Sequence, residues 1–364
     1  MVSFEALAAR PAGRPEVAVA LVGPGRVGRA LLKRFRPGTG APRLVAIANS
    51  SRMLLGADLD EDAWLTADDE HEHSADLSQL VAWLERSARG QAVLVDATAS
   101  VEVAERHADW LKRGLTVVTA NKWALAAPSL RWQALERERL RDPTRYQAAA
   151  TVGAGLPVLS TLDRLRQSGE TVHGVGGALS GTMSFLCGRI SAGLGPSDAV
   201  VEAMNAGLTE PDPRNDLDGL DVARKLVILA RAAGYPLVLE DVEVDSLVPP
   251  ELREGTVEQF LQQPDVFDKH WQHCVNQAGG TGELIAHVGR FDSSGKARVG
   301  LERIEPGHLL AGLQGAGNLV EIRTGCYGEQ PLVIAGPGAG IEVTALALWS
   351  GMQQSAPFSQ AILA

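Results

Sequence analysis

The clearest pattern along the chain is a six-residue apolar run at residues 17–22 (VAVALV), which predicts a buried strand. A glycine-rich turn follows at residues 23–28 (GPGRVG), and the next segment, RALLKRF, has the spacing of a helix. A strand, a tight turn and a helix in this order predict the first half of a βαβ unit.

Apolar runs and amphipathic segments continue to alternate beyond this unit. They predict further strands at 44–48, 92–95 and 116–119, and helices around 77–87 and 101–113. Strands that alternate with helices in this way pair in parallel, since each crossover returns the chain to the same end of the sheet. We therefore predict an α/β fold with a doubly wound, Rossmann-type sheet within residues 1–150.

The pattern of apolar and polar residues changes after about residue 150, where glycine-rich turns alternate with helical and hairpin patterns. A long helix is expected at 219–233, a hairpin around a DSSG turn at 284–299, and a last helix at 343–352. The chain has 364 residues, which exceeds the usual size of one core. We predict a second, α+β domain at 151–330.

Composition excludes several classes of protein. The net charge of -10 argues against nucleic acid as a partner, and no apolar run is long enough to span a membrane. Three scattered cysteines, without CxxC spacing, argue against a disulfide framework or a zinc site. We expect a soluble, cytoplasmic protein with a small-molecule ligand.

The glycine turn has the spacing of a dinucleotide site. Gly23 would make the tight turn, Gly25 would let the backbone approach a pyrophosphate, and Gly28 would let the helix pack on the strand. The amides of Arg26 and Val27, at the helix N-terminus, would face the phosphates. A purely structural turn is the alternative.

The end of the second strand indicates which dinucleotide is preferred. An acid there would bind the ribose 2'-hydroxyl of NAD, but the chain has Asn49-Ser-Ser-Arg52 instead. Asn49 with Arg52 would accept a 2'-phosphate, which favours NADP(H) and leaves NAD(H) possible. The alternative is that Arg52 is an ordinary loop residue with no role in cofactor recognition.

Polar side chains follow the third and fourth strands, at the edge where such sheets bind ligands. Thr98 comes after the third strand and Lys122 after the fourth. Thr98 could simply cap a helix. Lys122 leaves an apolar strand directly toward the expected site, which a purely structural role explains less well.

The densest set of charges is GLTEPDPRNDLDGLDVARK, residues 207–225. Asp216 or Asp218 could cap the helix that follows. Asp221 and Lys225 share one helix face, and that helix is apolar almost all round, so both should face a polar ligand or a cleft. Lys225 could protonate a carbonyl oxygen. Together with Asp216 and Asp221, Glu210 could bind the ammonium group of an amino acid.

These residues resemble homoserine dehydrogenases, most closely the dehydrogenase half of bifunctional aspartokinase-homoserine dehydrogenases. The resemblance covers most of the chain and rests on ANSSRMLL, VTANK, TVGAGLP, LSGTMSF, GLTEPDPRNDLDGLDVARKLVILAR and GPGAGIEVTA. It implies NADPH-linked, reversible reduction of L-aspartate 4-semialdehyde to L-homoserine, in threonine and methionine biosynthesis. It also implies a homodimer, and a first domain completed by residues 331–364.

The same resemblance implies roles for single residues. Lys225 corresponds to the proton donor, and Glu210 and Asp221 to substrate-binding acids. Lys122 corresponds to a lysine beside the nicotinamide and the substrate, which some accounts of the family give a share in proton transfer. Thr98, Gly207 and Gly340 correspond to cofactor contacts.

Some relatives hold a sodium ion on the loop that corresponds to VGAGLP, residues 152–157. In this chain the ion would be bound by the carbonyls of Val152, Ala154 and Leu156. The carboxylate that completes that site is replaced by Ala149. A monovalent cation is therefore only a possibility. The chain has no aspartokinase portion and no room for a regulatory ACT domain, so threonine feedback through such a domain is not expected.

Two other functions are alternatives to homoserine dehydrogenase, and each requires different residues. An aspartate-semialdehyde dehydrogenase needs a cysteine nucleophile, and Cys187 lies in an apolar stretch that favours packing. A catalytically silent NADPH-binding regulator would have no need of Lys225 with its acids.

Overall fold

The computed structural model describes residues 17–35, 42–67, 72–279, 284–313 and 315–355. The chain forms two compact units, each built on its own sheet. The first unit takes the chain up to residue 124, residues 133–150 and the chain from 341 onward; the second takes residues 125–132 and 151–340.

The first unit is built on a seven-stranded sheet in the order β4-β3-β2-β1-β5-β6-β7. Strands β2, β1, β5, β6 and β7 pair in parallel, and every residue of β1 is buried. This confirms the doubly wound α/β prediction. The strands are β1 Val17–Val22, β2 Arg43–Ala48, β3 Arg52–Leu55, β4 Glu72–Ser74, β5 Gln91–Asp96, β6 Thr116–Thr119 and β7 Tyr146–Gln147.

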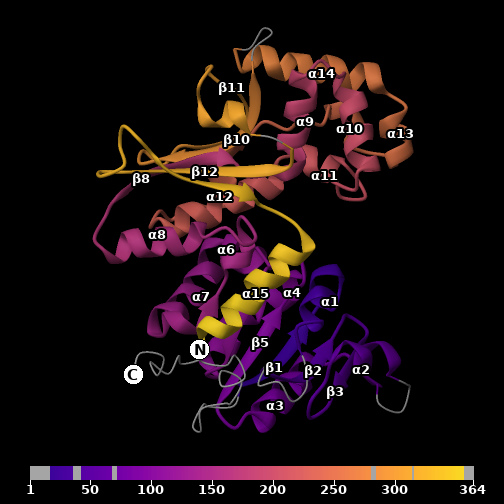
Figure 1. Cartoon of the computed structure of the whole chain (residues 1–364), viewed down its shortest axis with the longest axis vertical. Coiled ribbons are helices and arrows are strands. Elements are labelled where there is room, and N and C mark those ends of the chain that lie inside the picture. The colour runs from indigo at the N-terminus through magenta and orange to yellow at the C-terminus, as the bar shows by residue number, and fades with distance from the viewer. Residues whose placement is uncertain (1–16, 36–41, 68–71, 280–283, 314, 356–364) are drawn as a thin grey trace, which may run out of the picture. The chain divides into compact units, whose positions relative to one another are not determined.

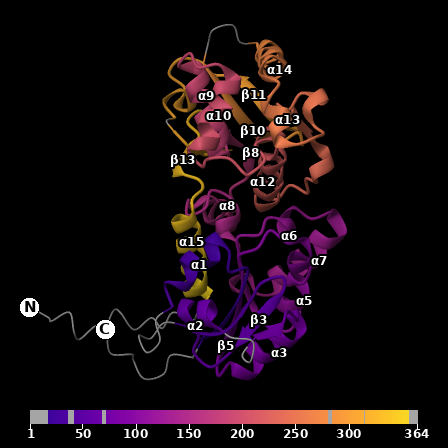
Figure 2. The same cartoon turned by 90° about the vertical axis from the view of Figure 1, so that its right-hand side faces the viewer.

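Helices cover both faces of this sheet. Helix α1 and the last helix, α15, lie side by side although they come from opposite ends of the described chain (Figures 1 and 2). Helix α3 packs on β1 and β2 through its buried leucines. The helices are α1 Arg26–Leu32, α2 Glu61–Thr66, α3 Leu77–Ser87, α4 Val101–Glu105, α5 His107–Lys112 and α15 Ile341–Ser355, while α6 Trp123–Ala126 and α7 Ser129–Arg141 each have residues in both units.

Two features of the first unit differ from the sequence prediction. Strands β3 and β4 add an antiparallel edge that was not predicted, because their pairing depends on a tight turn at Asn49 and on a partner about twenty residues away. The helix expected at 101–113 is two helices, since the backbone tightens at Arg106, whose amide donates to the carbonyl of Val103.

The second unit is built on a six-stranded mixed sheet in the order β13-β12-β8-β10-β11-β9. The predicted hairpin is confirmed as β10 and β11, and its turn is closed by Asp292, which accepts from the amide of Ser294. The strands are β8 Val172–Ala178, β9 Val242–Val244, β10 Ile285–Asp292, β11 Ala297–Arg303, β12 Gly317–Thr324 and β13 Leu332–Pro337. The α-helices are α8 Val158–Gln167, α9 Gly181–Ser191, α10 Pro196–Asn205, α11 Arg214–Leu217, α12 Leu220–Ala232, α13 Val257–Leu261 and α14 Pro264–Gln277.

The chain returns to the first unit at Ile341, not at 331 as expected. Residues 332–337 form β13, which pairs antiparallel with β12 in the second sheet, and this pairing moves the boundary. Within the described residues, no helix is long and apolar enough to cross a membrane.

Candidate active site

The glycine turn after β1 forms a cradle whose shape depends on the missing side chains. Gly23 has φ +95°, and a Cβ there would lie 2.6 Å from Cγ2 of Thr98. A Cβ on Gly28 would lie 2.2 Å from the carbonyl oxygen of Gly23. A Cβ on Gly25 would meet nothing within 4 Å. The first and third glycines are therefore required by packing, while the second faces open space of the kind that a pyrophosphate needs.

The start of α1 also fits an anionic group. Gly25 is the N-cap and has no side chain to accept a hydrogen bond from the first turn. The amides of Arg26 and Val27 therefore begin a helix that no side chain caps, which leaves donors for a phosphate.

Asn49 and Arg52 form the turn between β2 and β3. Oδ1 of Asn49 accepts from the amides of Ser51 and Arg52 at 2.9 and 2.8 Å, so this oxygen is used by the turn itself. Arg52 begins β3, and its guanidinium lies 4.1 Å from the ring centre of Trp64 and donates to that residue's carbonyl. The guanidinium is held at the end of β2 by the fold, which sequence reasoning did not anticipate.

Thr98 and Lys122 lie at the carboxyl ends of the neighbouring strands β5 and β6. Thr98 does not cap α4, because Ser100 does so by accepting from the amide of Val103. The amide and the hydroxyl of Thr98 instead donate to Oδ1 of Asp96, at 2.8 and 2.7 Å. Lys122 is half-buried in the loop after β6.

Asp96 is the centre of a buried network that the sequence analysis missed. Its Oδ2 accepts from Nδ2 of Asn121 at 2.9 Å and lies 3.0 Å from Nε2 of His107. Nδ1 of His107 lies 3.0 Å from the hydroxyl of Tyr146, whose pKa is raised by burial. Nothing in the local pattern signals this network, since its members are separated by up to fifty residues.

In the second unit, α12 places Lys225 in a buried position. The helix follows Gly219, whose φ of +78° and whose closeness to Val244 exclude a side chain. Asp218 accepts from the first amide of the helix at 2.8 Å. Nζ of Lys225 donates to the carbonyl of Leu179 at 2.7 Å and pairs with Asp221 at 2.9 Å.

One acid, Asp221, pairs with this lysine, and Asp216 lies near both Asp221 and Glu210. Asp216 accepts from the amide of Glu210 at 2.8 Å and lies 2.9 Å from the hydroxyl of Thr182. Burial raises the pKa of Asp216, and the nearby charges of Glu210 and Asp221 raise it further. The structure therefore connects Lys225, Asp221, Asp216 and Glu210 in one charged cluster. An excess of carboxylates over lysine suits an ammonium ligand.

Two contributors, Leu179 and Thr182, were not predicted as site residues. Both belong to the LSGT turn between β8 and α9, where Ser180 caps the helix. This stretch was noted for its resemblance, but only its pairing with the loop before α12 gives it a role.

The remaining predicted positions lie in backbone turns. Gly153 and Ala154 have φ values of +73° and +48°, and the carbonyl of Leu156 accepts from the amide of Val158. Gly207 and Gly340 have φ values of +67° and +137°. These positions need turn geometry, and in the described residues no cluster of at least three acidic, histidine or cysteine side chains could hold a metal ion.

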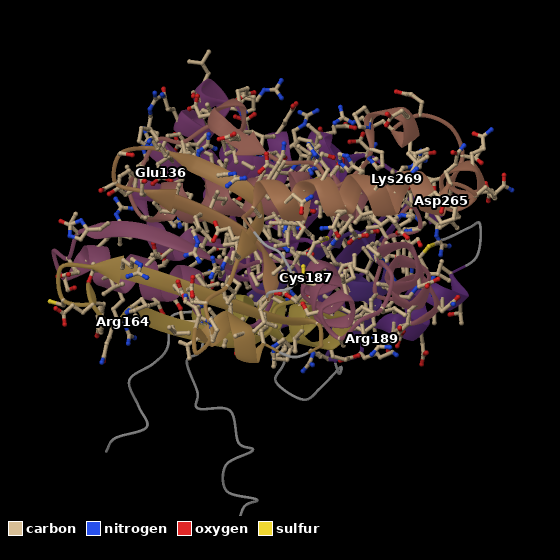
Figure 3. All side chains as sticks on the ribbon, turned by 90° about the horizontal axis from the view of Figure 1, so that it is seen from above. Glu136, Arg164, Cys187, Arg189, Asp265 and Lys269 are labelled. Atoms are coloured by element: carbon tan, nitrogen blue, oxygen red, sulfur yellow. The ribbon has the colours of Figure 1, made fainter. Side chains whose placement is uncertain are left out.

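Cys187 has no features of a nucleophile. It lies in the core of the second unit, while Arg189 of the same helix points outward (Figure 3). Burial raises the pKa of its thiol to about 12. A protonated, buried thiol is a poor nucleophile, which argues against Cys187 as the nucleophile of an aspartate-semialdehyde dehydrogenase.

Sequence comparison identifies the family. A model described as "Homoserine dehydrogenase" matches residues 157–352, and one described as "Homoserine dehydrogenase, NAD binding domain" matches residues 23–142. The chain is 36% identical to a homoserine dehydrogenase of Paracoccidioides brasiliensis, over 90% of this chain and 94% of that protein.

The chain belongs to the homoserine dehydrogenase family. It is also 39% identical to a chloroplastic bifunctional aspartokinase/homoserine dehydrogenase of maize, over 90% of this chain. It spans only 37% of that relative's length. The family's NAD-binding domain corresponds to the first unit, with its glycine turn.

Solved structures share the fold. A protein of unknown function from Candida auris is 30% identical with a TM-score of 0.85, over 94% of this chain and 98% of that one. A hyperthermophilic archaeal homoserine dehydrogenase in complex with NADPH has a TM-score of 0.69 at 22% identity, over 93% of this chain and 97% of that one. At this identity the archaeal enzyme supports the fold alone.

Proposed function

We propose that this chain catalyses the reversible, NADPH-linked reduction of L-aspartate 4-semialdehyde to L-homoserine, a step toward threonine and methionine. The observation that carries the proposal is the cluster around Lys225: a buried amine held by Leu179 and Asp221, beside two further acids. Family membership supports the same reaction.

The residues of the cluster have different roles, in substrate binding and in proton transfer. Glu210, Asp216 and Asp221 bind the substrate ammonium, which fixes the orientation of the amino acid. Lys225 holds a proton where the carbonyl oxygen needs it and takes it back in the oxidation direction. When NADPH is bound, it supplies the hydride that the carbonyl carbon accepts. The glycine turn and the amides of α1 would hold its pyrophosphate.

The direct test is nicotinamide absorbance. Purified protein given L-homoserine with NADP at alkaline pH should reduce the cofactor, and D-homoserine should not, because its ammonium cannot reach the acids in the same pose. Absence of reduction, with NADPH binding still detectable, would contradict the proposal and favour a silent NADPH-binding regulator.

We also propose a preference for NADP over NAD, based on Arg52. Its guanidinium is fixed on Trp64 beside the exposed Ser50 and Ser51, and no acid occupies position 49. Arg52→Ala should lower the ratio of kcat/KM for NADP to that for NAD by about ten- to a hundredfold, because one charge-assisted hydrogen bond is lost.

Arg86 provides the matched control, because it also stacks on a tryptophan, Trp83, on α3. Arg86→Ala should leave the cofactor ratio unchanged. An unchanged ratio in Arg52→Ala as well would rule out Arg52 as the recognition group.

We propose that the partner is a second copy of this chain, bound through the face of the second sheet that points away from α12. This face holds Arg290, which donates to Glu302 and Glu321. It also carries Arg323 and Glu243 on strands near opposite sides of the sheet. Two copies related by a twofold axis would set these opposite charges against each other.

Sedimentation should give twice the mass of the chain, and Arg323→Glu should shift the protein toward monomer. Arg164→Glu, an exposed change on α8, should not. A monomeric parent protein, or equal effects of the two changes, would contradict this interface.

A further inference from the structure

Asp96 is a buried charge that the proposed chemistry does not use. Its exposed fraction is 0%, as is that of His107, and Asn121 is 1% exposed. Burying an ionised carboxylate costs several kcal/mol unless it is fully hydrogen-bonded. Four donors meet this one: the amide and hydroxyl of Thr98, Asn121 and His107. Such a network fixes geometry more than it adds stability.

The proton positions in the network follow from its chemistry. An ionised Asp96 can only accept, so Nε2 of His107 carries the proton that faces it. Burial raises the pKa of Tyr146, so its hydroxyl keeps its proton, and this hydroxyl lies 3.0 Å from Nδ1 of His107. The contacts therefore run from Tyr146 through His107 to Asp96 and hold the carboxylate in one rotamer.

Asn121 connects this carboxylate to two loops. Its Nδ2 donates to Asp96 and to the carbonyl of Ser100 at 2.8 Å, within the loop after β5. Its Oδ1 accepts from the amide of Trp123 at 3.0 Å, within the loop after β6. Lys122 lies between the two bonded residues of this second loop. The orientation of Asn121 therefore fixes the backbone on both sides of Lys122.

The strand order places these loops at one half of the cofactor site. The glycine turn follows β1, and the adenosine ribose of a Rossmann cofactor lies at the end of β2. With the order β2-β1-β5-β6, the nicotinamide half must lie on the other side of β1, over the ends of β5 and β6. The Asp96 network lies directly beneath that half.

We propose that Asp96 and His107 are positioning residues, which through Asn121 and Thr98 fix the two loops that receive the nicotinamide half of the cofactor. They need not touch the cofactor or the substrate. The assignment of the nicotinamide rests on the proposed function, but the network and its loops are features of this chain alone.

The test is Asp96→Asn, which keeps the shape and changes only the hydrogen-bond pattern. If the new oxygen accepts from Thr98, the new amide nitrogen faces the amide nitrogen of Asn121, so two donors oppose each other. NADPH should bind about ten- to a hundredfold more weakly by fluorescence titration, which corresponds to one lost charge-assisted bond. The fragment 2'-phospho-ADP-ribose, which lacks nicotinamide, should bind within about twofold of its normal affinity.

A purely structural role predicts a different pattern. Loss of affinity for NADPH and for the fragment in equal measure would overturn the proposal, as would unchanged NADPH affinity. His107→Gln keeps an N–H directed toward Asp96 and should behave nearly as the parent protein, whereas His107→Leu should resemble Asp96→Asn. Equal effects of the two His107 changes would also count against it.

Leu84→Ala is the control for lost stability. Leu84 is fully buried on α3, so this change should lower the melting temperature and leave the ratio of the two affinities unchanged. Failure of the proposed function gives a separate result: the parent protein would bind NADPH without oxidising L-homoserine, and the comparison of the two ligands would still test the network.

Discussion

Replacing Lys225 with alanine is expected to lower kcat by about two to four orders of magnitude, the usual contribution of a positioned general acid. The affinity for NADPH should stay within about twofold of the parent protein, because the glycine turn and α1 lie in the other unit. Stopped-flow kinetics and fluorescence titration of the same samples would measure both quantities.

Lys269→Ala, an exposed change on α14, serves as the control and should keep full activity. Small primary amines added to Lys225→Ala should restore part of the turnover, since the lost group is a proton donor. Near-normal turnover in Lys225→Ala would remove this residue from the chemistry.

Gly25→Val is expected to weaken NADPH binding by about ten- to a hundredfold while the protein stays folded. A Cβ at this position meets no protein atom within 4 Å, and the backbone at φ -77° and ψ -156° accepts a side chain. The new atoms would occupy the space proposed for the pyrophosphate, and overpacking of this kind costs about 1–3 kcal/mol.

Gly188→Ala gives the matched control, because its Cβ also meets nothing within 4 Å. It should leave the NADPH affinity unchanged and raise the melting temperature slightly, because alanine favours the interior of α9 more than glycine does. Gly28→Ala would be a poor test, since its Cβ would collide with the carbonyl of Gly23 and disturb the fold. Unchanged cofactor affinity in Gly25→Val would place the pyrophosphate elsewhere.

The sequence by itself determined the features that depend on local periodicity. The buried strand at Val17–Val22, the helix at Leu77–Ser87 and the hairpin around Asp292 are found where they were predicted, because each is specified by neighbouring residues. Asp221 and Lys225 form an ion pair for the same reason: their spacing puts them on one helix face.

Only the tertiary structure decided the features that depend on distant partners. Residues 332–337 belong to the second sheet because they pair antiparallel with β12. Arg52 is held by Trp64, and Asp96 meets His107 and Tyr146, across separations that no local pattern encodes. Hydrogen bonds and stacking between distant segments form only once the core has brought the segments together. The partners of these residues therefore cannot be predicted from the sequence.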